Sequence, residues 1–208
     1  IIPSHNRFEG LVLALESVKN QSLTDYEVIV INDGSDDERY LDCNFDINVK
    51  LIHLKTNSVK EKGYFSDSIR NYGINKAKGK YIAFLDSDDV WKKDKLEKQI
   101  AFMNEKDIAF SFTTYQPISA YSRELFSIIR APKQMTYHSY LKNTIIGCLT
   151  VIVDIEKTGD FLIPNIRDGA TIKNYKSMLM EVCDRDFGGN ISEMGVNTVV
   201  ITVWNGND

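Results

Sequence analysis

Short apolar runs rich in β-branched residues alternate with segments of helical spacing over the first half of the chain, and this alternation limits the fold most. The runs, which are candidate strands, lie at residues 1–2, 26–31, 49–54, 81–85 and 108–115. Several lack polar alternation, as expected for parallel strands covered on both faces. The helical stripes are Leu11, Leu15 and Val18; Phe65, Ile69 and Tyr72; and Leu96, Ile100 and Met103. We therefore expect an α/β fold, a three-layer α/β/α sandwich with a mostly parallel central sheet.

A basic run surrounds the third predicted helix. Its charged residues include Lys92, Lys93, Lys95, Glu97 and Lys98. Such a run can bind an anion, but it is more typical of a solvated helix surface. We interpret it as solvated.

Composition and charge exclude several classes of protein. The 208 residues, 43% of them hydrophobic, are enough to bury a large core. A net charge of −4 disfavours the broad positive face of a duplex-binding protein, so we expect no nucleic-acid partner. No apolar run approaches the roughly 20 residues of a membrane-spanning helix, so we expect no transmembrane segment. The sequence leaves the oligomeric state open.

Cysteine usage and the first residue give two further expectations. Cys43, Cys148 and Cys183 are an odd number without CxxC spacing, which predicts reduced thiols and a cytoplasmic location. A core strand begins at once with Ile1, which indicates a fragment whose start has been trimmed.

The strand at 81–85 leads directly into Asp86, Ser87, Asp88 and Asp89. Three carboxylates this close together repel one another unless a cation or a set of donors compensates them. Mg²⁺ and Mn²⁺ prefer oxygen ligands and often bridge one or two carboxylates to a diphosphate. The segment therefore favours a metal site, although Asp88 or Asp89 could instead cap the following helix.

Two other loops follow predicted strands and should converge on the same edge of the sheet. In the loop after residue 31, Asp33 could accept hydrogen bonds from a base or a ribose hydroxyl, although its neighbours are ordinary turn formers. In the loop after residue 2, Arg7 offers donors to a phosphate, whereas His5 is interpreted as a surface or structural histidine. The chain has no GxGxxG, GxxxxGK[ST] or GxSxG motif, which argues against dehydrogenases, P-loop NTPases and α/β-hydrolases.

Four segments in series, 1–7, 30–37, 69–74 and 81–91, resemble the family 2 glycosyltransferases in order and spacing. The likeness is close to about residue 115 and continues more weakly to about 166. It implies the GT-A fold, a nucleotide-diphosphate-sugar donor, Mg²⁺ or Mn²⁺, and inverting transfer to a saccharide or lipid-linked acceptor in bacterial surface polysaccharide synthesis. It also leaves open a peripheral association with the inner face of the membrane.

The resemblance divides the chain and assigns a donor site. Residues 1–115 would form the donor half, and 116–208 the acceptor-side half of the same domain, divergent or truncated at its C-terminal part. The implied residues around the nucleobase, nucleotide and sugar are Pro3, Ser4, Asn6, Arg7, Asp33, Arg70, Asn71, Asp86 and Ser87. Asp88 is the implied metal ligand, and Asp89 supports it or shares the coordination. A metal there would stabilise negative charge on the leaving nucleoside diphosphate.

The general base is where the resemblance weakens. Family members usually carry a Glu-Asp or Gln-Asp pair followed by an aromatic residue, and this Asp deprotonates the acceptor hydroxyl. The best register places Asn174 at that position, and an amide cannot accept the proton. Asp168 is the substitute, although Asp168-Gly169 could be an ordinary turn.

Two functions therefore stay open: an active glycosyltransferase, and a catalytically impaired domain that only binds nucleotide sugars. A nucleotidyltransferase is disfavoured, because residues 4–7 do not form a glycine-rich basic loop.

Overall fold

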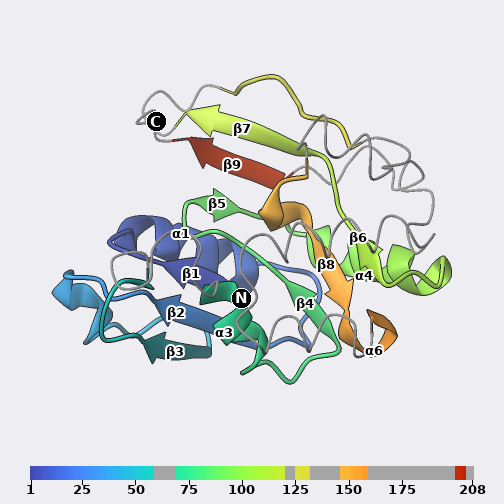
Figure 1. Ribbon diagram of the computed structural model, residues 1–208. Helices are drawn as coiled ribbons and strands as arrows, with labels where there is room; N and C mark the ends of the chain where they lie inside the picture. Colours follow the sequence, from blue (N-terminus) through green and yellow to red (C-terminus); the bar gives the residue numbers. More distant parts are fainter. Residues whose placement is uncertain (59–68, 120–124, 132–145, 159–199, 205–208) are drawn as a thin grey trace.

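The computed structural model describes residues 1–58, 69–119, 125–131, 146–158 and 200–204 (Figure 1). The strands are β1 (Ile2–Ser4), β2 (Val28–Asn32), β3 (Val49–His53), β4 (Tyr81–Ala83), β5 (Asp89–Val90), β6 (Phe110–Ser111), β7 (Tyr115–Ser119), β8 (Ile152–Asp154) and β9 (Val200–Trp204). The helices are α1 (Phe8–Lys19), α3 (Ile69–Ile74), α4 (Lys95–Glu105) and α6 (Ile155–Thr158), with 3₁₀ turns η1 (Glu38–Tyr40) and η2 (Cys148–Thr150).

A parallel sheet of order β1-β2-β3 organises the first half of the chain. Ile1 joins it to β4, because its nitrogen donates to the Ala83 carbonyl at 2.8 Å and its carbonyl accepts from the Leu85 N–H at 3.1 Å. From β4 the pairing continues antiparallel in the order β4-β8-β6, and a small third sheet has the order β5-β9-β7. The carboxyl ends of β1, β2 and β4 therefore lie at one edge.

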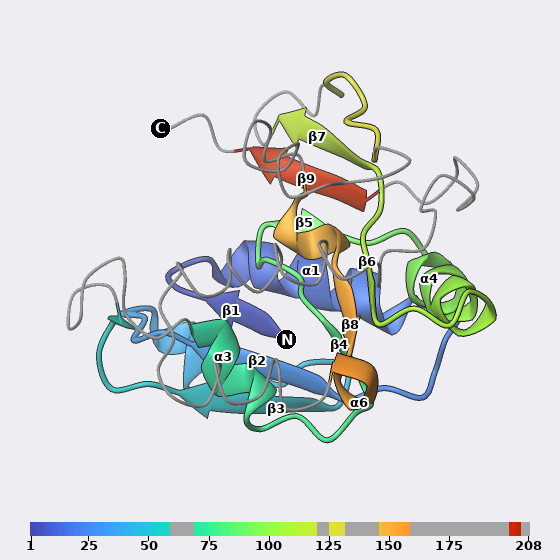
Figure 2. The ribbon, with the colours of Figure 1, turned by 45° about the vertical axis from the view of Figure 1, so that its right-hand side comes forward.

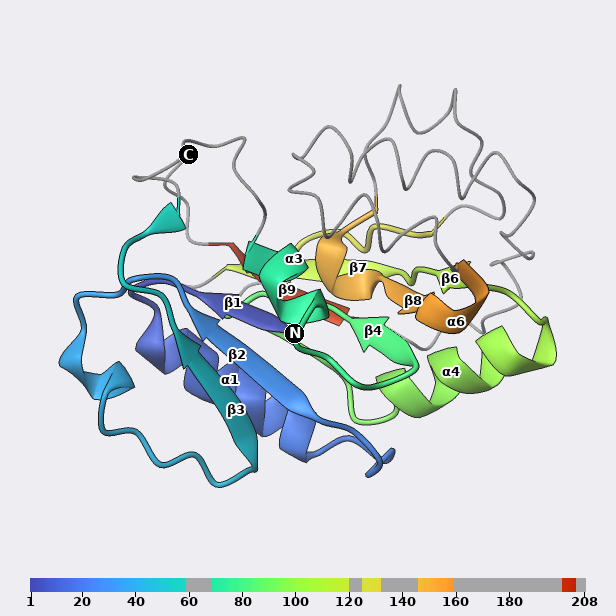
Figure 3. The same ribbon diagram turned by 60° about the horizontal axis from the view of Figure 1, so that its bottom comes forward.

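Helices cover both faces of the parallel strands, as Figures 2 and 3 show for α1 and α3. The alternation in β2 explains this arrangement, since Val28 and Val30 pack into the same core as Leu11 of α1, whereas Ile29 and Ile31 are buried on the opposite face. A strand buried on both faces has an uninterrupted apolar sequence. The α/β prediction with a three-layer arrangement is confirmed.

One predicted strand needs correction. The run at 108–115 forms two short strands, β6 and β7, separated by residues 112–114, and β6 is antiparallel to β8. Burial on both faces produces an apolar run whatever the direction of the neighbouring strand, so the sequence could not reveal this direction.

The predicted face of the second helix is also wrong where the structure describes it. Tyr72 is exposed, and the buried residues of α3 are Asn71 and Gly73. A Cβ atom at Gly73 would lie 2.6 Å from Ile1 Cγ2, so α3 approaches the sheet too closely for a bulky side chain. Phe65, the first residue of that stripe, lies outside the described residues.

The basic run around α4 is not uniformly solvated. Lys95 is 0% exposed, and its Nζ lies 4.1 Å from the centroid of the Trp91 ring. Lys95 precedes Gln99 by four positions and Met103 by eight, and both of these residues are buried. Lys95 therefore belongs to the buried stripe of the helix, and the solvated interpretation was wrong for this residue.

The second half of the chain contributes strands β7, β8 and β9 to the described structure. Cys43 and Cys148 are free thiols, whereas Asp168, Asn174 and Cys183 lie outside the described residues. No helix within the described ranges is long and apolar enough to cross a membrane.

Candidate functional site

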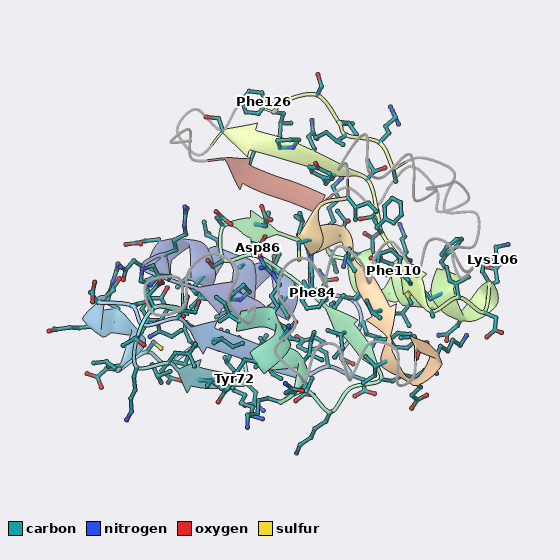
Figure 4. The ribbon with its side chains drawn as sticks, in the orientation of Figure 1. Tyr72, Phe84, Asp86, Lys106, Phe110 and Phe126 are labelled. Carbon is teal, nitrogen blue, oxygen red and sulfur yellow. The ribbon has the colours of Figure 1, made fainter. Side chains whose placement is uncertain are left out.

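The loop after β4 presents two aspartates at the carboxyl edge of the sheet. The side chains of Asp86 and Asp88 are 31% and 32% exposed. Asp86 Oδ1 accepts a hydrogen bond from Arg70 Nη2 of α3, and Asp88 Oδ2 lies 3.3 Å from Arg7 Nη1 in the loop after β1. Figure 4 shows Asp86 below β5. The fold thus brings three of the predicted segments together, and each carboxylate faces an arginine from a different segment.

Helix α1 fixes the backbone of this acidic loop. The Asp89 N–H donates to the Asp86 carbonyl at 3.0 Å, and Ser87 is buried. A Cβ atom at Gly10 would lie 2.5 Å from the Ser87 carbonyl oxygen, so the helix approaches the loop at a distance that only glycine permits. Gly10 is not among the predicted site residues, although a glycine inside a helical pattern often marks a close approach of another segment.

Asp88 and Asp89 of this loop differ in environment. Burial raises the pKa of Asp88, Arg7 opposes this rise, and the charge of Asp86 adds to it. Such a carboxylate gains from added positive charge. Asp89 is buried in β5. The pKa of the Tyr115 phenol is raised mainly by the burial of Tyr115 and further by the negative charge of Asp89. Asp89 therefore interacts with β7.

Asp33, at the end of β2, is fully engaged by the protein. Its Oδ1 accepts from the Ser58 N–H at 2.9 Å, and its Oδ2 accepts from Ser58 Oγ at 2.8 Å and from Asn57 Nδ2 at 3.2 Å. Gly34 follows in the left-handed region with φ of +62°, which directs the loop against the segment at 56–57. The carboxylate therefore ties together the loops after β2 and β3.

The loop after β1 rests on residues 33–36 of the loop after β2. His5 Nδ1 lies 2.8 Å from the Asp33 carbonyl oxygen. Asn6 has a positive φ of 50°; its N–H donates to Ser35 Oγ at 3.0 Å, and its Oδ1 accepts from the Asp36 N–H at 2.9 Å. Asn6 and His5 thus hold the loop in place, which agrees with the structural interpretation of the histidine.

Three other residues of the implied site are buried. Pro3 lies within β1 opposite Ile31, Ser4 ends that strand, and Asn71 lies on the covered face of α3. Their side chains are therefore part of the packed fold behind this edge of the sheet. Arg7, Arg70, Asp86 and Asp88 are the members of the implied set that combine charge with partial exposure.

The donor set suits a divalent ion that takes most of its ligands from elsewhere. No group of three or more acidic, histidine or cysteine side chains converges within the described part of the chain. Asp86 and Asp88 supply two carboxylates, and Mg²⁺ is usually bound through one or two carboxylates plus phosphates and water. The residues present therefore fit a metal that arrives with a diphosphate.

A hollow of roughly 600 Å³ lies at the opposite edge of the sheet. Among its lining residues are Tyr26 and Val28 at the start of β2, and Tyr81 at the start of β4. Ligands of parallel α/β sheets bind outside the carboxyl ends of the strands, so the charged edge is the better candidate site.

Comparison with known structures supports the fold. The Staphylococcus aureus TarS fragment 1–349 crystallised with UDP superposes with a TM-score of 0.63 and 19% identity, covering 100% of this chain and 57% of that one. A second TarS structure, in complex with UDP-GlcNAc, gives the same TM-score at 16% identity. At this level of identity the likeness concerns the fold, which is that of GT-A glycosyltransferases.

Comparison of sequences extends the likeness to family. TuaG of Bacillus subtilis, named for teichuronic acid biosynthesis, is 40% identical over 185 residues, which are 86% of this chain and 70% of that protein. WfgD of Escherichia coli, a UDP-Glc:alpha-D-GlcNAc-diphosphoundecaprenol beta-1,3-glucosyltransferase, is 36% identical over 166 residues, which are 79% of this chain and 62% of WfgD. The family model described as glycosyl transferase family 2 matches residues 1–152. The chain therefore belongs to glycosyl transferase family 2.

Proposed function

We propose that the chain transfers a sugar from a nucleoside-diphosphate donor to a hydroxyl group of a lipid-linked saccharide, with inversion, during synthesis of a bacterial surface polysaccharide. The observation that carries the proposal is the pair of partly exposed carboxylates, Asp86 and Asp88, each facing an arginine at the carboxyl edge of the sheet. WfgD, which uses UDP-glucose and an acceptor on diphosphoundecaprenol, supports the choice of donor and acceptor classes.

The charged side chains divide the work at the diphosphate. Asp88 would hold the metal with Asp86 beside it, and the buried Asp89 would support the turn through its N–H. A bound Mg²⁺ or Mn²⁺ supplies positive charge that offsets the charge developing on the leaving diphosphate. Arg7 and Arg70, which pair with the carboxylates in the free protein, turn their guanidinium groups to the phosphates.

The rest of the donor lies over the neighbouring loops. Asp33 and the loop it holds border the nucleobase, and the buried Asn71 lies beneath the nucleotide. In this arrangement residues 1–115 form the donor half and residues 116–208 the acceptor half. The acceptor oxygen attacks the anomeric carbon from the face opposite the nucleotide, and Asp168 is the proposed base that removes its proton. The enzyme works in the cytoplasm, at the face of the membrane where its acceptor is anchored.

Nucleotide binding tests the metal-dependent part. We expect UDP and UDP-glucose to raise the melting temperature with Mn²⁺ and not without it, because a ligand that binds only the folded state stabilises it. Asp88→Asn should abolish the Mn²⁺-dependent shift. The control is Asp46→Asn, since Asp46 is an exposed carboxylate paired with Lys19. An Asp88→Asn variant that binds UDP as the unaltered protein does would overturn the assignment.

Turnover separates the enzyme from a binding domain without a base. Slow hydrolysis of UDP-glucose with Mn²⁺ that disappears in Asp168→Asn favours the enzyme. Binding with neither hydrolysis nor transfer to a lipid-linked N-acetylglucosamine acceptor favours the impaired domain. The anomeric configuration of the first product, followed by NMR, tests inversion, and a retained configuration contradicts the mechanism.

A further inference from the structure

We infer that Tyr40 is a positioning residue of the donor site, because its hydroxyl group fixes the segment that carries Arg7. The inference rests on the proposed function, in which Arg7 and Asp88 contribute to binding of the diphosphate and its metal. Tyr40 lies at the end of η1, 33 positions beyond Arg7. None of the sequence motifs pointed to it.

The site uses the single polar side-chain atom of Tyr40 twice. Its Oη lies 2.5 Å from Ser4 Oγ and accepts a hydrogen bond from the Arg7 N–H at 3.2 Å. Tyr40 is 0% exposed and Ser4 is 3% exposed, so bulk water cannot replace the hydroxyl at the serine. A buried polar group that loses its partner is costly to the protein. One hydroxyl thus holds both ends of the loop after β1.

The ring of Tyr40 is held as firmly as its hydroxyl. It packs edge to face against Phe8, the first residue of α1, with ring centroids 5.3 Å apart and an interplanar angle of 82°. The Arg39 guanidinium lies 4.9 Å from the centroid of the same Phe8 ring and pairs with both Asp37 and Glu9. η1 is therefore fastened to the first turn of α1, and the hydroxyl has a fixed position.

As a consequence, the backbone position from which the Arg7 side chain extends is fixed. Arg7 is the N-cap of α1, its own side chain makes no capping hydrogen bond, and its N–H donates to the Tyr40 hydroxyl. The Arg7 side chain is 46% exposed, and its Nη1 lies 3.3 Å from Asp88 Oδ2. A mobile charged group on a fixed backbone can exchange Asp88 for a phosphate without losing its direction, and fixed placement of this kind favours binding.

The test uses two tyrosines that both bind the main chain in or beside α1. Tyr40→Phe keeps the ring and removes the two contacts near the site. Tyr26→Phe is the matched control, because the Tyr26 hydroxyl donates to the Val18 carbonyl at 3.2 Å near the other end of the helix. By calorimetry with Mn²⁺, we expect Tyr40→Phe to weaken UDP binding about tenfold, and Tyr26→Phe to leave it within about twofold. Equal weakening in both variants would mean that the effect reports general stability, and it would overturn the inference.

The same substitution in an Arg7→Ala variant shows whether Tyr40 affects UDP affinity through Arg7. In Arg7→Ala, which already lacks the guanidinium, Tyr40→Phe should cause no further loss of UDP affinity. A further tenfold loss in that background would show that Tyr40 acts by another route, and it would also overturn the inference.

Failure of the proposed function has a different signature. An unaltered chain that binds no UDP counts against the proposed function, and the inference is then tested without ligand. Rotation of the Arg7 guanidinium about its Nε–Cζ bond, measured by ¹⁵N NMR, should be slowed by Asp88. Tyr40→Phe should speed this rotation and Tyr26→Phe should not, whereas equal rates in all three proteins contradict a positioning role.

Discussion

The loops after β2 and β4 carry aspartates at the same edge of the sheet, but the protein treats their carboxylates differently. Asp33 is buried, and its oxygens accept three hydrogen bonds from Asn57 and Ser58. Asp86 and Asp88 are one-third exposed and face arginine side chains. Donors that belong to the fold commit Asp33 to structure, whereas arginines on long side chains can release the other two carboxylates to a ligand.

This difference indicates that position at a strand end does not decide what an aspartate does. The donors around it decide, because a buried charge is tolerated only where hydrogen bonds replace its lost hydration. Four changes can break or sharpen the comparison.

Lys95 gives the largest expected effect, since it is a buried charge whose ammonium group lacks hydrogen-bond acceptors. Its Nζ has no hydrogen-bond partner among the described residues and lies over the Trp91 ring. Burial lowers the pKa of Lys95 from 10.5 to about 7. At pH 7 this shift costs on the order of 4 kcal/mol, part of which the ring contact offsets. We expect Lys95→Met to raise the free energy of unfolding by about 2–4 kcal/mol.

The pH dependence of that gain follows from the direction of the shift. Between about pH 7 and 10.5 the unfolded chain binds the Lys95 proton and the folded chain does not, so folding stability rises with pH in this window. The gain from Lys95→Met should therefore be largest at pH 7 and below, and should shrink towards pH 10. Urea unfolding at pH 6.5 and 9 measures it. A destabilising Lys95→Met at both values would break the argument that hydrogen-bond partners decide whether a buried charge is tolerated.

Asp33 gives the next largest effect, in the opposite direction. Asp33→Ala removes the acceptor of three hydrogen bonds from the partly buried Asn57 and Ser58, and with it the tie between the loops after β2 and β3. We expect the free energy of unfolding to fall by about 3 kcal/mol. Asp88→Ala is the matched control and should change it by less than about 0.5 kcal/mol, because its carboxylate is one-third exposed. Similar losses in the two variants would erase the distinction between the loops.

The parts of the fold that the sequence predicted are those with a local repeat. The strands of the parallel sheet and helix α1 show such repeats, since each buries an apolar pattern of its own. The acidic loop was predictable from local sequence as well, because Asp86 and its neighbours directly follow an apolar strand. Its location at the charged edge follows from topology.

The parts that the sequence did not predict depend on contacts between distant segments. Tyr72 looked like a core residue, but the sheet is approached by Gly73. Lys95 looked solvated, but it shares the buried face of its helix with Gln99. The contact of Tyr40 with Arg7 spans 33 positions, and no local pattern can encode a partner at that separation.

Gly10 tests whether the acidic loop depends on the helix behind it. Gly10→Ala places a methyl group 2.5 Å from the Ser87 carbonyl oxygen, so the loop or the helix must move. We expect a loss of about 2 kcal/mol in the free energy of unfolding, which is typical of overpacking, and weaker UDP binding with Mn²⁺. Gly79→Ala is the control, because its Cβ atom would lie at an ordinary 3.5 Å from the Tyr81 carbonyl oxygen. A Gly10→Ala variant with unaltered stability and affinity would show that the loop does not need this approach.

Arg70 gives the smallest effect on stability and the most direct test of the comparison. Arg70→Gln removes the cation that faces Asp86, and Lys98→Gln removes a cation from the similarly exposed Asp94 pair of α4. Both should change the free energy of unfolding by less than about 1 kcal/mol, because partly exposed ion pairs contribute little. Only Arg70→Gln should weaken UDP binding with Mn²⁺, by a factor of about three to ten, since its guanidinium is proposed to leave Asp86 for a phosphate. A loss of more than about 2 kcal/mol in Arg70→Gln, with affinity unchanged, would place Asp86 in the same structural class as Asp33, because its partner would then be part of the fold and not exchangeable for a ligand.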